Sequence, residues 1–112
     1  MDSLFKNNRA VGRGANPAQE GTPGGGSGGA IYMDGNRMKL NLRRSTLHDN
    51  SAREGGGAIF FVSNDLSGRM VIANSELYDN RSESFETDGL PGIFYLGVDP
   101  PRIVNGTTIS AR

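Results

Sequence analysis

The sequence predicts an all-β protein, a right-handed parallel β-helix of about three coils. This prediction rests first on two repeated segments. GGAIY at residues 28–32 returns as GGAIF at 56–60, and STLHDN at 45–50 returns as SELYDN at 75–80. The offsets are 28 and 30 residues, and self-similarity at a period of roughly 20–50 residues is typical of stacked repeats. Between the repeated segments, apolar and polar residues alternate without a helical period, which indicates short strands.

The composition suits a thin core with frequent turns, in one domain covering residues 1–112. Glycine accounts for 17 of the 112 residues, and apolar residues for 35%. The 12 lysines and arginines balance the 12 aspartates and glutamates, so no net charge draws the chain to nucleic acid or to an anionic membrane. Cysteine is absent, which excludes a disulfide framework and a thiolate zinc site. No apolar run approaches the ~20 residues of a membrane span.

The chain opens on the end of a repeat, because SLFKNN at residues 3–8 aligns with 45–50 and 75–80. Residues 1–5 have neither the basic start nor the apolar core of a signal peptide. The chain is therefore expected to be either cytoplasmic or an internal piece of a longer array. The repeats favour the second interpretation.

A loop is predicted at residues 11–27, which are rich in glycine and proline and contain almost nothing to bury. The corresponding link in the next coil, 51–55, has only five residues. Insertions between stacked units lie on one side of the array and often carry binding. The competing interpretation is a disordered insert without a role.

Three short strands are expected in each coil, and the full coils span 28–50, 56–80 and 92–109. The predicted strands are 30–32, 38–43 and 46–48 in the first coil, 58–62, 69–73 and 76–78 in the second, and 92–96 in the third. Further along the third coil, residues 103–105 match 72–74. Met70 is expected over Leu40, and Ile72 over Leu42. The segments 51–55 and 81–90 are interpreted as links.

Stacking places equivalent residues of successive coils in columns about 4.8 Å apart. Two apolar columns are predicted: Ile31, Ile59, Ile93 and Phe5, Leu47, Leu77. Paired glycines, which permit φ values or close contacts that a side chain would prevent, stand at Gly28, Gly29, Gly56 and Gly57.

A polar column is predicted at Asn8, Asn50 and Asn80, each of which follows a strand and precedes a turn. Asparagine tolerates left-handed dihedrals, and we expect these residues to adopt them. Their amides can also bond to the asparagines above and below, which satisfies the polar groups that become buried.

Two motifs recur in this chain: GGAI, and a large apolar residue followed by two positions and asparagine, as in FKNN, LHDN and LYDN. Their combination resembles the repeats of the polymorphic outer membrane proteins. It is also similar to many bacterial extracellular right-handed β-helix repeat proteins. The resemblance spans roughly residues 3–96, and leucine replaces phenylalanine in the second and third copies. It implies an extracellular or cell-surface passenger region, often an adhesin, attached to a larger protein.

Asp49 and Asp79 are the candidate catalytic pair, because alignment one coil apart sets their carboxylates about 5 Å apart, near the separation in retaining glycosidases. A calcium site is a second interpretation, although Ca²⁺ needs 6–8 oxygen ligands. Aspartate in an asparagine-rich turn usually bonds to the local backbone, so the structural interpretation is preferred. His48 aligns with Lys6 and Tyr78 and is interpreted as a surface residue.

The strand segments also carry a locally basic face, with Lys39 and Arg69 in one column. Such a face can bind sulfated glycans, lipid phosphates or nucleic acid, but no aromatic residues are interleaved as single-strand binding requires. A solvated face without a ligand is the simpler interpretation. The basic residues of this face are Arg37, Lys39, Arg43, Arg44 and Arg69. The candidate ligand-facing positions are Lys39, Arg43, Arg69, Asp49 and Asp79.

These observations favour a non-catalytic structural or adhesive repeat module that contacts glycans or cell surfaces, with no metal, no cofactor and no nucleic-acid partner. The alternative is a carbohydrate-active β-helix enzyme of the polysaccharide lyase or hydrolase type. A third interpretation is a stalk without activity of its own. Uncapped coils expose unpaired strand edges, so end-to-end self-association is also expected.

Overall fold

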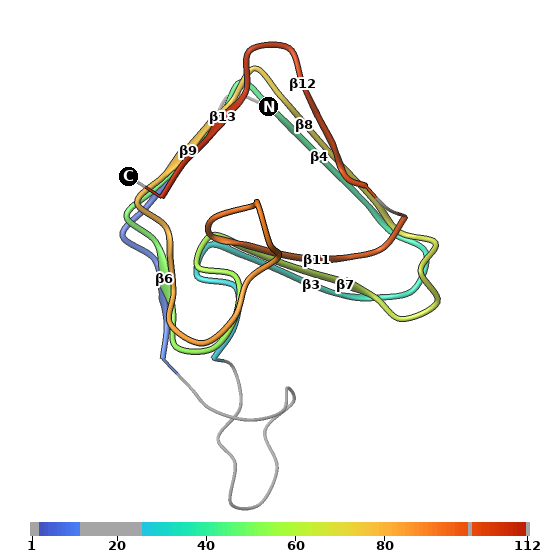
Figure 1. Ribbon diagram of the computed structural model, residues 1–112, viewed down its shortest axis with the longest axis horizontal. Helices are drawn as coiled ribbons and strands as arrows, with labels where there is room; N and C mark the ends of the chain where they lie inside the picture. The colour runs from blue at the N-terminus through green and yellow to red at the C-terminus, as the bar shows by residue number, and fades with distance from the viewer. Residues whose placement is uncertain (1–2, 12–25, 99, 112) are drawn as a thin grey trace, which may run out of the picture.

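The computed structural model describes residues 3–11, 26–98 and 100–111, which form thirteen strands and no helix. The strands pair only in parallel and build four sheets, so the predicted parallel β-helix of about three coils is confirmed. Strands of successive coils superpose when the molecule is viewed as in Figure 1. From β11 (Ile93–Leu96) through β12 (Arg102–Val104) to β13 (Thr108–Ile109) the chain turns counterclockwise, and the later coils lie nearer the viewer, as in a right-handed helix.

The first sheet contains the three strands that lead into the asparagine column, together with one strand of the last coil. Its strands, in spatial order, are β1 (Leu4–Lys6), β5 (Thr46–His48), β9 (Glu76–Tyr78) and β13 (Thr108–Ile109). Phe5 pairs with Leu47, Leu47 with Leu77, and Leu77 with Ile109. The apolar column therefore extends one coil further than the repeated motif.

Two further sheets enclose the rest of the core. One contains β3 (Ile31–Gly35), β7 (Ile59–Ser63) and β11 (Ile93–Leu96), and the other contains β4 (Lys39–Arg43), β8 (Arg69–Ala73) and β12 (Arg102–Val104). Leu40 pairs with Met70 and Leu42 with Ile72, as expected. Ile103 pairs with Ile72 and Val104 with Ala73. Asn105 then follows β12 with a φ of 50°, as Asn74 follows β8 with a φ of 51°, so the expected match between 103–105 and 72–74 is confirmed.

The fourth sheet was not predicted, because its strands lie where links were expected. Its members are β2 (Arg9–Ala10), β6 (Ser51–Ala52) and β10 (Arg81–Ser82). A strand of two residues is too short to show alternation. Ala52 is nevertheless only 1% exposed, so this side also closes the core. Each complete coil contains four strands rather than three.

The core is a set of apolar columns that run along the axis of the helix. In β7 the burial alternates, with Ile59 and Phe61 buried and Phe60 half-buried. The Phe61 and Tyr95 rings stack with their centroids 5.2 Å apart. Because the side chains of each coil pack on the coils beside it, one coil cannot bury its own apolar face.

The repeated glycines meet two different steric requirements. Gly28 and Gly56 adopt φ values of 72° and 70°, a region that favours glycine. Gly57 instead lies against the next coil, where an added Cβ would be 2.5 Å from the backbone carbonyl carbon of Arg81. The predicted loop at 11–27 falls almost wholly at residues 12–25, outside the described residues.

Buried hydroxyl groups form a short column beside the first sheet. The Ser75 hydroxyl accepts from the backbone N–H of Ser45 at 3.1 Å and donates to the Ala73 carbonyl at 2.9 Å. The Thr107 hydroxyl occupies the equivalent place for Ser75. The repeat thus uses a small hydroxyl residue to join the turn of one coil to the next.

Candidate functional site

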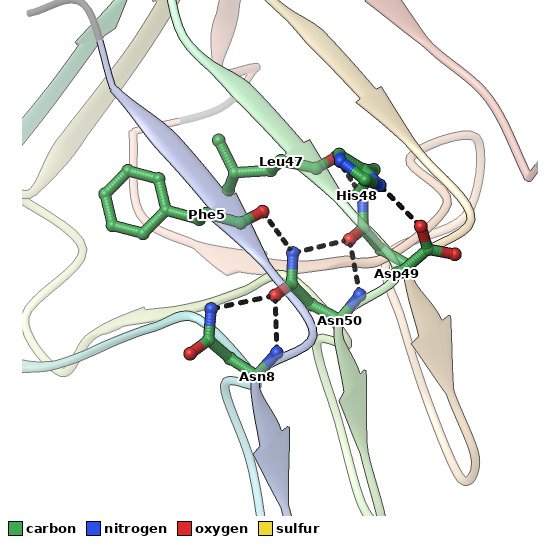
Figure 2. A network of polar contacts seen from close by, with 7 residues as sticks. Phe5, Asn8, Leu47, His48, Asp49 and Asn50 are labelled. Atoms are coloured by element: carbon green, nitrogen blue, oxygen red, sulfur yellow. Dashed lines mark hydrogen bonds and ion pairs between the residues drawn. The ribbon is translucent and has the colours of Figure 1, made fainter.

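The asparagine column forms a hydrogen-bonded ladder along the helix axis. The Asn8 side chain donates to Oδ1 of Asn50 at 3.0 Å, and the Asn50 side chain donates to Oδ1 of Asn80 at 2.9 Å. Each amide group also reaches the previous coil, since Nδ2 of Asn50 donates to the Phe5 carbonyl and Nδ2 of Asn80 to the Leu47 carbonyl. Figure 2 shows the Asn8, Phe5 and Asn50 contacts. These side chains therefore join successive coils.

The left-handed conformation expected at these asparagines falls one residue earlier. It occurs at Asn7, Asp49 and Asp79, with φ values of 60°, 56° and 54°. The asparagine must direct its amide into the ladder, so the residue before it turns the corner. Asparagine and aspartate tolerate this region better than other non-glycine residues, which explains the aligned aspartates without reference to catalysis.

Asp49 and Asp79 nevertheless share a solvent-exposed corner. Both border an open depression of about 640 Å³ together with Arg81 and Glu86. Nδ1 of His48 lies 2.5 Å from Oδ2 of Asp49, as Figure 2 shows. Among residues 3–11, 26–98 and 100–111, no group of three or more histidine, cysteine or acidic side chains is arranged to hold a metal ion.

His48 lies on the outer side of the first sheet. Its ring stacks on that of Tyr78, with centroids 4.9 Å apart and an interplanar angle of 5°. The register also pairs it with Lys6. The stack and the contact with Asp49 fix the orientation of the imidazole ring.

The strongest candidate for ligand contact is the outer side of the sheet β4–β8–β12. We define its cationic face as Arg37, Lys39, Arg69 and Arg102, all of which are exposed. Lys39 and Arg69 are register partners. Arg102 lies on the next coil, where it pairs with Val71. Two adjoining pockets, of about 140 and 520 Å³, share Lys39 and Arg69 in their walls.

The smaller pocket has an apolar floor beneath its cations. Val71, Tyr95, Val98 and Pro100 line it with Lys39, Arg69 and Arg102. The Tyr95 hydroxyl donates to the Val98 carbonyl, which attaches the segment after β11 to the core. The shape of this pocket is therefore maintained by a buried side chain, while its cations remain in solvent.

Arg43, also a candidate ligand-facing residue, is placed apart from these pockets. Its Nε donates to Oδ1 of Asn41 at 3.1 Å, and its register partner is Ala73. Of the five candidate ligand-facing residues, the structure therefore brings together Lys39 and Arg69 on one side, and Asp49 and Asp79 on another. Arg102 was missed because the aligned residue of the previous coil, Val71, is apolar, so the repeat predicts no basic side chain at this position.

An outer aromatic stack was also missed. Tyr32, Phe60 and Phe94 lie in register on β3, β7 and β11, and their rings stack with centroids 4.9 and 5.5 Å apart. The edge of Phe85 packs against Phe94. The aligned aromatic residue after each GGAI or GI was the available signal. The faces of these rings are covered by one another, so the stack stabilises the coils.

The fold and its surface features define a parallel β-helix repeat module. Residues 2–34 match the family model of the Chlamydia polymorphic membrane protein repeat. Searches of curated proteins and of solved structures returned no match. The matched repeat is one of surface or outer-membrane proteins, which indicates a surface repeat module. Within the described part of the chain, no helix has the length and apolarity to cross a membrane.

Proposed function

We propose that this chain is a non-catalytic adhesive module whose cationic face contacts glycans on a cell surface. The observation that carries the proposal is the grouping of Lys39, Arg69 and Arg102 around one pocket. Like charges on register partners destabilise a sheet, so a role in binding accounts for keeping Lys39 opposite Arg69. The surface location indicated by the matched repeat is consistent with this role.

A carbohydrate-active enzyme is the competing proposal, and its carboxylates would be Asp49 and Asp79. We assign these residues a structural role, because both occupy left-handed turn positions and Asp49 is engaged by His48. A lyase or hydrolase also needs its acid and base directed at a substrate groove. The depression beside these aspartates is open, and Arg81 and Glu86 share its wall.

A glycan-array experiment combined with a reducing-sugar release assay tests the proposal. The protein is expected to retain a subset of glycans and to release no sugar from them. The double variant Lys39→Gln/Arg69→Gln is expected to lose this retention, whereas Asp79→Asn is expected to keep it. Sugar release that disappears in Asp79→Asn would establish an enzyme instead. Absence of glycan retention would favour a stalk without binding activity.

A second proposal is self-association through the open edges of the sheets. Strand β11 is an edge strand of its sheet, and Leu96 on it is 45% exposed. Exposed apolar edge strands favour pairing with another chain. Such pairing would extend the stacked sheets without a new interface geometry.

A further inference from the structure

We propose that the ligand of the cationic face is a polyanionic glycan, with sulfate or carboxylate groups bound between Lys39, Arg69 and Arg102. This inference rests on the proposed glycan-binding function and specifies the chemistry of the ligand. It is argued below from the distribution of charge, the pairing of the cations and the size of the pocket.

Charge is strongly segregated in a chain whose net charge is zero. The segments 35–48, 66–75 and 100–111, which contain β4, β8 and β12, include no aspartate or glutamate. The same segments hold six of the twelve lysines and arginines: Arg37, Lys39, Arg43, Arg44, Arg69 and Arg102. The charged side chains within these three segments are therefore all positive, although the molecule as a whole is neutral.

The cations of the smaller pocket carry the donors that an anionic ligand needs. Among the described residues, no acidic side chain forms an ion pair with Lys39, Arg69 or Arg102. Guanidinium groups bind sulfate-like and carboxylate oxygens through paired N–H donors, while the lysine ammonium acts as a point charge. One anionic group placed between Lys39 and Arg69 would also relieve the repulsion between these register partners.

The dimensions of the pocket favour a polymer over a free small molecule. Its volume of about 140 Å³ is below the ~300–1,000 Å³ typical of small-molecule sites. It therefore accommodates one substituent and the adjoining part of a sugar ring, with Val98 and Pro100 beneath the apolar ring surface. A chain lying along the sheet would present its next anionic group to the adjoining pocket lined by Arg37.

Nucleic acid and lipid phosphate fit this surface less well. Single-stranded nucleic acid requires exposed aromatic faces for base stacking, and Tyr95, the one aromatic residue in the pocket wall, is only 7% exposed. Membrane-surface binding combines basic residues with large apolar side chains that enter the lipid. Val98 and Pro100 are small, and Val98 is half-buried.

The experiment is calorimetric titration with a heparin oligosaccharide and with its desulfated counterpart, at low and at physiological salt. We expect binding of the sulfated probe that weakens as salt rises, because exposed charges are screened. Lys39→Gln/Arg69→Gln should weaken it by at least about tenfold, as expected when charge-assisted bonds are removed. The matched control Arg81→Gln removes one exposed positive charge from β10, outside both pockets, and should change affinity by less than about twofold.

Several outcomes would overturn the inference, and thermal melting first establishes that each variant folds. Equal affinity for the desulfated probe, or equal loss in Arg81→Gln, would show that the cationic face does not recognise sulfate. Stronger binding to phosphatidylserine vesicles or to single-stranded DNA would assign the face to another partner. If only neutral glycans are retained on the array, the inference fails while the proposed function stands. If no glycan is retained, both fail.

Discussion

The side-chain amide of Asn50 donates to Oδ1 of Asn80, one coil further along, at 2.9 Å, and Asn50 is itself only 1% exposed. Asn50→Ala is therefore expected to lower the free energy of unfolding by about 2–3 kcal/mol, because it leaves buried groups on Phe5 and Asn80 without one of their partners. The measurement is chemical denaturation of the wild type and the variant.

Asn8→Ala is the matched control, since Asn8 is exposed at the end of the same ladder. Its loss should cost no more than about 1 kcal/mol, the net value of a typical hydrogen bond. Equal destabilisation by the two substitutions would show that the contribution of the ladder to the free energy of unfolding does not depend on the burial of its side chains.

Gly57→Ala is expected to destabilise the protein by about 3 kcal/mol, at the upper end of the range for overpacking. The added methyl group would meet the backbone of Arg81, with its carbonyl carbon 2.5 Å away, and backbone of the next coil cannot move aside alone. Gly35→Ala is the comparison, since its Cβ would lie 3.5 Å from Sδ of Met38, an ordinary contact. Melting temperatures that fall equally in both variants would contradict the steric argument.

The turn between β7 and β8 is expected to weaken in acid. Hydrogen bonds from the Ser67 side chain and backbone lower the pKa of Asp65 below its ordinary value. A carboxylate whose pKa is lowered by folding stabilises the fold at pH values above its ordinary pKa of about 4. This stabilisation is lost as the pH falls through the lower pKa of the folded state. The melting-temperature difference between the wild type and Asp65→Asn should therefore shrink as the pH falls below about 4. A pH-independent difference would show that charge is not involved.

Self-association is expected to depend on Leu96. Lysine on an edge strand opposes pairing with another chain, so Leu96→Lys should reduce the mass observed by sedimentation at high protein concentration. Leu66→Lys serves as the control, because Leu66 is 53% exposed but lies in a turn outside the strands. A wild-type protein that sediments as a monomer at every concentration would exclude the proposal.

The register of the coils was predictable because it depends on side chains that recur at matching positions. Leu47 aligns with Leu77 in sequence and pairs with it in the structure, and the same holds for Lys39 and Arg69. A one-residue slip would turn every buried side chain outward, so an apolar column specifies its own alignment.

Features that depend on backbone geometry or on divergent residues were not predictable. The two-residue strand β6 has no periodic pattern, and the left-handed residue proved to be Asp49 rather than Asn50. Arg102 joins the cationic face although its segment resembles the repeat only at neighbouring positions. Charge on an outer surface is not constrained by packing, so repetition carries little information about which cations converge there.

The parallel pairing of successive coils has a mechanical consequence. Hydrogen bonds between the coils run along the helix axis, so a force that pulls the two ends apart acts on one coil boundary at a time. Opening a boundary frees one coil, such as the 30-residue repeat that separates Asn50 from Asn80, which extends to about 100 Å. A surface module of this kind would lengthen in discrete steps under tension, and the coils that remain stacked would keep their shape while the load is dissipated.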